Sequence, residues 1–268
     1  MPIGTPEYGR NTATPTNVAY RVGRISSYLS GRWLDYGCAE GGYTSSLLAH
    51  GVTSVVGVDV LKDRLKEAEA RQIPNATFYS FDGSRLNFPD ESFNGAFMNE
   101  VLEHVADEQE SLREIRRVLQ PGGHLIVISP NRWFPVEGHT VTMVGMRFGP
   151  APLIPWLPER LTRKWTTARN YWPRQLVDHV HQAGFVIQEV GFIWPVFEQF
   201  PWLPGPIISV YRRWLDKIDD VPGLRRFGLS TLIIATKPSA GRGGRPGPIR
   251  PGSEWTVGCT PLRDQCRR

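Results

Sequence analysis

Two acidic residues and a histidine stand close together in the segment NEVLEHV, residues 99–105, directly after an apolar run. If a helical turn begins there, the i, i+3 and i+4 spacing of Glu100, Glu103 and His104 places the three side chains on one face. Two carboxylates and an imidazole can bind a divalent cation or transfer a proton as a general acid or base. Alternatively, Glu103 and His104 make only local hydrogen bonds. The residues alone leave these three roles open.

A glycine-rich turn, GCAEGG at residues 37–42, lies between an apolar run ending near Asp35 and a helix-like segment. The turn lacks the Gly-Lys-Ser/Thr sequence of a phosphate-binding loop. Ala39 stands where the second glycine of a dinucleotide fingerprint would approach a pyrophosphate. S-adenosylmethionine, which has no phosphate, fits better. Asp35 could accept from its ammonium group, and Gly37 and Gly41 allow the backbone to approach closely.

Acidic residues also end the next two strand-like segments. Asp59 ends the run VVGVD about 20 residues beyond the turn, which suits hydrogen bonds with both ribose hydroxyls of either NAD or S-adenosylmethionine. In FDGSRLNFPDESF, residues 81–93, Asp82 could accept from an adenine amino group and the Gly83 amide could donate to a ring nitrogen. We expect ten residues to surround the cofactor, the last two bordering the transferred methyl group: Asp35, Gly37, Cys38, Gly41, Asp59, Val60, Asp82, Gly83, Asn99 and Glu100.

Strand-like and helix-like segments alternate along the chain. Val18, Val22, Ile25 and Leu29 recur at helical spacing and predict an amphipathic helix over residues 15–30. The predicted strands are 32–36, 54–59, 76–80, 95–99, 122–129, 185–193 and 229–237, and the other predicted helices are 42–50, 61–71, 107–119 and 173–183. Such alternation is typical of a parallel sheet covered by helices on both faces.

Three blocks, in the expected order, resemble the class I S-adenosylmethionine-dependent methyltransferases, including the type 11 and type 12 domains. LDYGCAEGGYTSSLL is similar to their first motif, FDGSRLNFPDESFNGAFMNEVLEHV to the adenine-binding loop and fourth strand, and IRRVLQPGGHLIVISPN to the turn into the fifth strand. The resemblance covers roughly residues 30–240. It implies a Rossmann-like α/β fold with a seven-stranded, mostly parallel sheet whose last strand is antiparallel. Ala39 and Asn94 depart from the family pattern, and we expect Asn94 to be structural.

The segment NEVLEHV also resembles the Glu-x-x-Glu-His pattern of ubiquinone-pathway O-methyltransferases and of small-RNA 2′-O-methyltransferases. In those enzymes such residues bind a divalent ion, and the RNA enzymes add a later histidine, for which His139 in SPNRWFPVEGHT is the counterpart. We assign no metal, and name Glu100, Glu103, His104 and His139 as the residues that could hold one. His104 and His139 are the candidate catalytic bases.

The predicted organisation is a flexible N-terminus (1–14), a methyltransferase domain (15–238) and a disordered tail rich in Gly, Pro and Arg (239–268). Two aromatic-rich inserts, about 131–172 and 194–227, interrupt the domain, and in the family such segments form a substrate lid. Their aromatic residues suit a sugar or aromatic ring, a lipid-linked substrate at a membrane surface, or simple packing of the lid. PWLPGPIISVYRRWLDKI, residues 201–218, mixes apolar and basic residues as an interfacial helix would.

Charge argues against nucleic acid as a partner. The tail from Ser239 holds six arginines and two acidic residues, so it carries +4 of the net charge of +5 and the other 238 residues carry +1. The chain also lacks an Asn/Asp-Pro-Pro-Tyr base-methylating motif and a separate RNA-binding module. There is no apolar leader, no membrane-spanning run and no disulfide framework among the three cysteines, which favours the cytoplasm, with peripheral membrane contact still compatible.

Together these observations predict a methyltransferase that uses S-adenosylmethionine to methylate a small-molecule or lipid-linked acceptor, at oxygen. The alternatives are an RNA 2′-O-methyltransferase and a protein that binds S-adenosylmethionine without catalysis. The sequence does not specify the acceptor or the oligomeric state.

Overall fold

The structure is a computed structural model that describes residues 14–139, 141–143, 146–148, 151–196, 205–219, 221 and 223–239. The predicted flexible N-terminus and the arginine-rich tail therefore lie outside the described residues, except for Thr14 and Ser239. Three aromatic residues of the second insert, Phe197, Phe200 and Trp202, also lie outside them.

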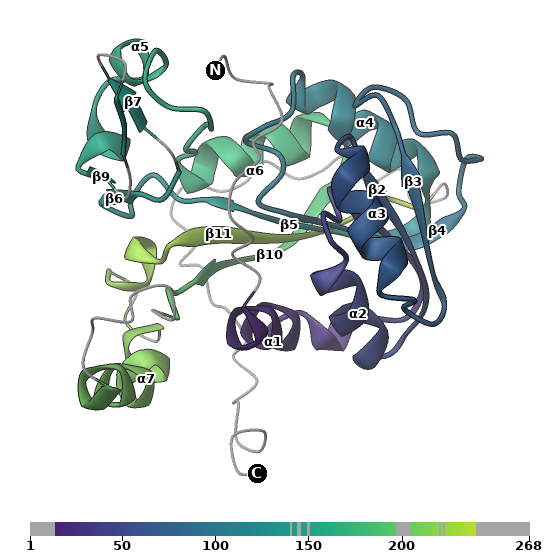
Figure 1. Ribbon diagram of the computed structural model, residues 1–268, viewed down its shortest axis with the longest axis horizontal. Coiled ribbons are helices and arrows are strands. Elements are labelled where there is room, and N and C mark those ends of the chain that lie inside the picture. The colour runs from purple at the N-terminus through teal and green to yellow at the C-terminus, as the bar shows by residue number, and fades with distance from the viewer. Residues whose placement is uncertain are drawn as a thin grey trace.

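A seven-stranded sheet forms the centre of the molecule (Figure 1). Its strands are β1 (Gly31–Tyr36), β2 (Val52–Asp59), β3 (Ala76–Ser80), β4 (Phe93–Asn99), β5 (Leu119–Pro130), β10 (Val186–Ile193) and β11 (Ser230–Thr236). They are arranged in the order β3-β2-β1-β4-β5-β11-β10. The first five are parallel, whereas β11 is antiparallel to both β5 and β10. This arrangement confirms the predicted Rossmann-like α/β fold with an antiparallel last strand.

Helices cover both faces of the sheet, as predicted (Figure 1). They are α1 (Pro15–Gly23), α2 (Gly42–Ala49), α3 (Lys62–Ala70), α4 (Glu108–Val118) and α6 (Pro173–Gln182). One buried cluster joins the apolar sides of α1 and α2 to the sheet, and a second joins α4 and α6 to it. The central strands β1, β4 and β11 are largely buried on both faces because each face lies under a helical layer.

The first helix is shorter than predicted. α1 begins after Thr14, whose side chain accepts from the Asn17 amide, and it ends at Gly23 rather than near residue 30. A 3-10 turn, Ser26–Tyr28, replaces the last predicted turns. All four predicted apolar residues (Val18, Val22, Ile25 and Leu29) are nevertheless buried. The apolar spacing thus identified the buried residues, although Ile25 already leaves the helical conformation, with φ −115° and ψ 1°.

The two inserts form small irregular substructures toward the left of Figure 1. The first contains β6 (Val136–Glu137), β7 (Val141–Met143), β8 (Met146–Phe148), β9 (Ala151–Pro152), a 3-10 turn (Ile154–Trp156) and α5 (Glu159–Thr162). The second contains α7 (Gly205–Asp219) and a 3-10 turn (Arg225–Phe227). The rings of Trp133 and Phe227, 5.8 Å apart, connect the two inserts. Among the described helices, none is long and apolar enough to cross a membrane.

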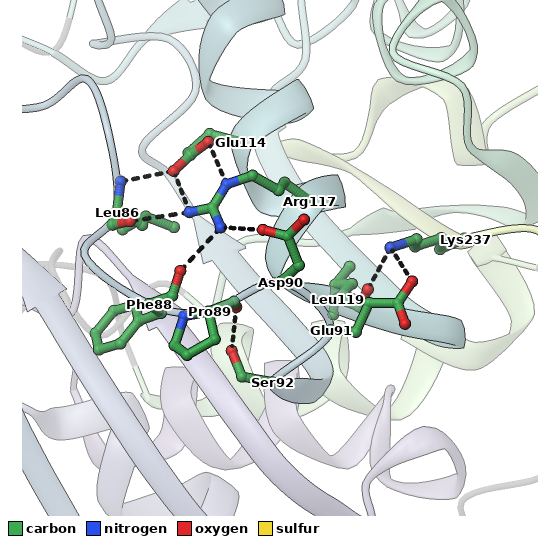
Figure 2. Close-up of polar contacts among 10 residues, drawn as sticks. All are labelled: Leu86, Phe88, Pro89, Asp90, Glu91, Ser92, Glu114, Arg117, Leu119 and Lys237. Carbon is green, nitrogen blue, oxygen red and sulfur yellow. Dashed lines mark hydrogen bonds and ion pairs between the residues drawn. The ribbon is translucent and has the colours of Figure 1, made fainter.

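The loop between β3 and β4 is held by a side chain of α4 (Figure 2). The guanidinium of Arg117 donates to the carbonyl oxygens of Leu86 and Phe88 and forms ion pairs with Asp90 and Glu114. Glu114 in turn accepts from the Leu86 amide at 2.8 Å. Because this loop also carries Asp82 and Gly83, α4 positions the segment in which we expect the adenine to bind.

Candidate active site

The glycine-rich turn is held on the end of the neighbouring strand. The Gly37 and Cys38 amides donate to the Val58 carbonyl, and the Ala39 amide donates to Asp59 Oδ2 at 2.9 Å. Gly37 has φ +79° and Gly41, which precedes α2, has φ +76°. A Cβ at Gly37 would lie 2.4 Å from Val101, so a side chain there would collide with the loop after β4. Both glycines are thus required by the turn geometry.

Ala39 has φ +47°, in the region that glycine adopts more easily than alanine. This explains physically why the related family has a glycine at that position. The second departure, Asn94, is a structural residue, as expected. Its Oδ1 accepts from the Arg32 amide at 2.8 Å and its Nδ2 donates to Gln120 Oε1 at 2.9 Å.

Asp35 lies near the carboxyl end of β1, with only 2% of its surface exposed. The Thr44 hydroxyl, on the first turns of α2, donates to Asp35 Oδ2 at 2.6 Å. Burial raises the pKa of Asp35 to about 7, the Thr44 hydrogen bond opposes that shift, and the charge of Asp59 adds to it. A buried carboxylate of raised pKa can be stabilised in its ionised form by a cationic ligand.

Asp59 lies at the carboxyl end of β2 and is also buried. Its Oδ2 accepts from Ala39 and its Oδ1 accepts from the Leu61 amide at 2.8 Å, and each carboxylate oxygen can accept one further hydrogen bond. A Cβ at Gly83 would lie 3.6 Å from Val60, so the loop after β3 approaches the end of β2. Asp59, Val60 and Gly83 are therefore neighbours, as the prediction of one nucleoside site requires.

Two other predicted cofactor residues differ in exposure. Asp82 is exposed, and hydrogen bonds from the Ser84 hydroxyl and amide lower its pKa, so its carboxylate is ionised at neutral pH. Cys38 is buried, and burial raises the pKa of its thiol far above the usual range. The Cys38 side chain therefore packs in the turn, and its reactivity is suppressed.

Asn99 and Glu100 are bonded to an arginine that the sequence analysis did not identify. Arg21, on α1, donates to Asn99 Oδ1 at 2.6 Å and to Glu100 Oε1 at 2.8 Å. The Ser230 hydroxyl also donates to Glu100 Oε1, at 2.6 Å. Although burial raises the pKa of Glu100, the Arg21 guanidinium holds it below the usual range. The signal for Arg21 was present in the sequence, because it lies three residues after Val18 on the apolar side of the helix.

The helical turn considered for NEVLEHV does not form. Residues 100–106 adopt turns and bends, and Glu100 has a positive φ of 54°. The Glu100 side chain points to Arg21, whereas Glu103 Oε2 accepts from the Ser129 hydroxyl at 2.7 Å. The prediction that Glu100, Glu103 and His104 share a helical face was therefore wrong. Turns and bends form here in place of a helix because the chain must leave β4 and connect to α4.

Glu103, His104 and His139 form the cluster that the structure assembles instead. One ligand atom from each lies within 4.8 Å of the others, and the two imidazole rings are 5.1 Å apart. Glu103 is fully buried, and its Oε1 has no hydrogen-bond partner among the described residues. Burial, with the charge of Glu100 added, raises the pKa of Glu103 well above its usual range. The cluster thus unites the later histidine with the residues after β4, as the resemblance implied.

His139 is oriented by Glu137, a second residue that the sequence analysis missed. His139 Nδ1 lies 2.9 Å from Glu137 Oε1, and Asn170 donates to the other oxygen of this buried carboxylate. Burial lowers the pKa of His139, but the hydrogen bond and charge of Glu137 outweigh it and raise the pKa to about 9. The sequence indicated this pair only through the i, i+2 spacing of Glu137 and His139 on either side of Gly138. A carboxylate holding Nδ1 leaves Nε2 as the reactive nitrogen.

Comparison with known proteins gives consistent results for this region. A methyltransferase domain family matches residues 34–127, which include the glycine-rich turn, Asp59, the loop after β3, Glu103 and His104, whereas His139 lies beyond the match. An uncharacterised methyltransferase of Mycolicibacterium vanbaalenii is 28% identical over 212 residues, covering 76% of this chain and 75% of that protein. The ubiquinone biosynthesis O-methyltransferase of Parvibaculum lavamentivorans is 30% identical over 137 residues. That match covers 50% of this chain and 51% of the relative, so the chain spans about half its length.

The fold has solved counterparts. An S-adenosylmethionine-dependent methyltransferase from Mesorhizobium loti superimposes with a TM-score of 0.56 over 82% of this chain and 97% of that one, at 19% identity. At that identity the likeness shows the fold.

Proposed function

We propose that the chain is an S-adenosylmethionine-dependent methyltransferase that transfers the methyl group to an oxygen atom of a small-molecule or lipid-linked acceptor. The observation that carries the choice of oxygen is the Glu137–His139 pair, because a hydroxyl acceptor must lose a proton during transfer. The similarity to an O-methyltransferase supports the same choice.

The cofactor site suits S-adenosylmethionine, whose sulfonium supplies an electrophilic methyl group when bound. Asp35 would stabilise a cationic ammonium group, since its carboxylate is buried and already bonded on one oxygen only. Asp59 would accept from two hydroxyl groups, and Asp82 and Gly83 would contact the base. The glycine-rich turn would contact the cofactor through Gly37, Cys38 and Gly41. Val60 lies beside Gly83.

Asn99 and Glu100 would border the methyl group at the end of β4. Their positions are determined by Arg21, which bonds to both. Glu100 is ionised and paired, so we assign it a positioning role rather than proton transfer. This network holds the end of β4 rigid, and rigid alignment is the main protein contribution to an in-line displacement.

His139 is the residue we assign as the base, and His104 is its neighbour in the cluster. The Glu137 carboxylate selects the tautomer with the proton on Nδ1 and stabilises the imidazolium that forms when Nε2 takes a proton. His139 comes from the first insert, so this insert would complete the catalytic site. The second insert contacts the first through Phe227 and Trp133. We propose that both inserts form a substrate lid on a domain of residues 15–238.

A divalent cation is the second candidate role for the same cluster. The donor set of one carboxylate and two imidazoles suits such an ion, and the unpartnered Oε1 of buried Glu103 is the observation in its favour. Glu100 would take no part, since Arg21 occupies it. Activity abolished by a chelator and restored by Mg²⁺ or Mn²⁺ would favour the ion, whereas unchanged activity would leave His139 as a free base.

The alternatives predict different behaviour. An RNA 2′-O-methyltransferase would bind RNA with a steep dependence on salt. A protein that binds S-adenosylmethionine without catalysis would form no S-adenosylhomocysteine with any acceptor pool. We propose a cytoplasmic location, on the basis of the cysteine usage described above.

The central test is calorimetric titration with S-adenosylhomocysteine, comparing the natural chain with Asp59→Asn. Asn keeps the shape of the side chain but removes one acceptor. We expect micromolar binding that weakens at least about tenfold in the variant, since each lost charge-assisted hydrogen bond costs about 1.5–3 kcal/mol. Asp63→Asn, a change at an exposed residue of α3, should leave the affinity unchanged. Absence of binding by the natural chain would contradict the proposal.

A further inference from the structure

The helix α7 presents an apolar face that no other part of the described chain covers. Ile207, Val210 and Trp214 follow one another at i, i+3 and i+7, which places them on one side of the helix. Their exposed fractions are 57%, 55% and 51%. Three large apolar side chains half or more exposed on a single helix form a surface that a monomeric protein in water rarely maintains without a function.

The side of α7 next to this apolar face contacts the protein. The Tyr211 hydroxyl donates to the Pro195 carbonyl just beyond β10, at 3.0 Å, and Ile208 is half-buried. Because these contacts fix the rotation of the helix, its apolar face is directed outward. Figure 1 shows α7 away from the central sheet, at the margin of the molecule.

Basic side chains border the same face. Arg213 and Lys217 are exposed, and the Lys217 ammonium lies 4.5 Å from the centre of the Trp214 ring. We call Ile207, Val210, Arg213, Trp214 and Lys217 the α7 outer face. An apolar stripe that contains tryptophan and is flanked by cations is complementary to the headgroup and acyl boundary of an anionic bilayer.

We propose that the α7 outer face binds the surface of an anionic phospholipid bilayer. This inference rests on the proposed function in one respect: bilayer binding would present the lid to a lipid-linked acceptor. The second insert contacts the first through Phe227 and Trp133, and the first insert carries His139. A protein docked through α7 would therefore have the residues of its lid close to the lipid surface.

A bilayer fits this face better than a second copy of the chain does. In a symmetric dimer the same patch meets itself, so the interface would enclose Arg213 and Lys217 of both copies. Like charges at a desolvated contact are unfavourable, whereas anionic headgroups neutralise them.

The test is co-sedimentation of the full chain with vesicles, either phosphatidylglycerol mixed with phosphatidylcholine or phosphatidylcholine alone. We expect binding to the anionic vesicles at least about tenfold tighter, since each surface cation contributes roughly fivefold. The arginine-rich tail could also attract anionic vesicles, so the assay is repeated at about 0.5 M salt, where exposed charges are screened. Apolar insertion persists under that condition.

Ile207→Ser combined with Trp214→Ser should abolish binding at high salt, and Lys217→Glu should weaken binding at low salt. Tyr79→Ser, a change at an exposed aromatic residue on β3, is the matched control and should bind like the natural chain. Circular dichroism and S-adenosylhomocysteine titration confirm that each variant is folded and keeps its cofactor site, which separates failure of this inference from failure of the proposed function. The proposal is overturned if the double variant binds the vesicles as well as the natural chain does. It is also overturned if the natural chain is a dimer that becomes monomeric in the double variant.

Discussion

The guanidinium of Arg21 and the carboxylate of Glu100 form an ion pair of 2.8 Å between residues that are far apart in sequence. The pair connects the first helix to the loop after β4, and its Arg21 side chain is 4% exposed. The helix α1, which would otherwise only cover one face of the sheet, therefore also holds the residues at the carboxyl end of β4.

Replacing Arg21 with methionine should destabilise the protein by about 3 kcal/mol, because the partly buried Glu100 would lose its only ion-pair partner among the described residues. The free energy of unfolding in urea measures this effect. Lys66→Met, which breaks a pair whose partners are 75% and 78% exposed, serves as the control and should cost less than about 0.5 kcal/mol. The double variant Arg21→Met with Glu100→Gln should recover part of the loss; no recovery would contradict the role given to the pair.

Methyl transfer should increase with pH up to about pH 9, because His139 must lose its proton before it can act as a base and Glu137 raises its pKa to about 9. Replacing Glu137 with glutamine removes the charge that raises this pKa, so the rise in kcat should move to lower pH, by about one unit or more. His50→Gln, a change at the residue that follows α2, should leave the pH profile unchanged. If kcat has the same pH profile in the natural chain and in Glu137→Gln, His139 is not the base.

The stability of the natural chain relative to Asp35→Asn should fall as the pH rises. The folded pKa of Asp35 is raised to about 7, and its unfolded value is about 3.9. A raised folded pKa means that the folded state binds the proton more tightly. The stabilisation is complete below about pH 4 and is lost as the pH rises through 7. Between pH 5 and pH 8, the free energy of unfolding of the natural chain should fall by about 2–3 kcal/mol relative to that of Asp35→Asn.

Replacing Arg117 with methionine should loosen the loop after β3. The variant loses hydrogen bonds to two carbonyl oxygens and two ion pairs, which should lower the free energy of unfolding by about 2 kcal/mol. S-adenosylhomocysteine should also bind more weakly, since Asp82 and Gly83 lie in that loop. Arg113→Met, which removes one exposed contact with the Gln109 carbonyl, should change neither quantity. If the Arg117 variant binds S-adenosylhomocysteine as tightly as the natural chain, the loop after β3 is not part of the cofactor site.

Local residue patterns were sufficient to predict the sheet and the turn after β1. Buried strands have apolar runs, the turn needs residues that accept positive φ, and acids follow strands whose carboxyl ends meet at one edge of a parallel sheet. The same reasoning assigned Asp59, Val60 and Gly83 to one cofactor site, and the structure places Gly83 beside Val60. All of these depend on short-range spacing, which can be read along the chain.

Tertiary structure alone decided the partners of the charged residues. Helical spacing suggested that Glu100, Glu103 and His104 share a face, yet the turn after β4 directs Glu100 to Arg21 and Glu103 to Ser129. His139 joined the cluster, and Glu137 raised its pKa, because the first insert returns to the residues that follow β4. Pairing of distant charges depends on where loops close and on how deeply each group is buried, and neither quantity has a periodic signature in the sequence.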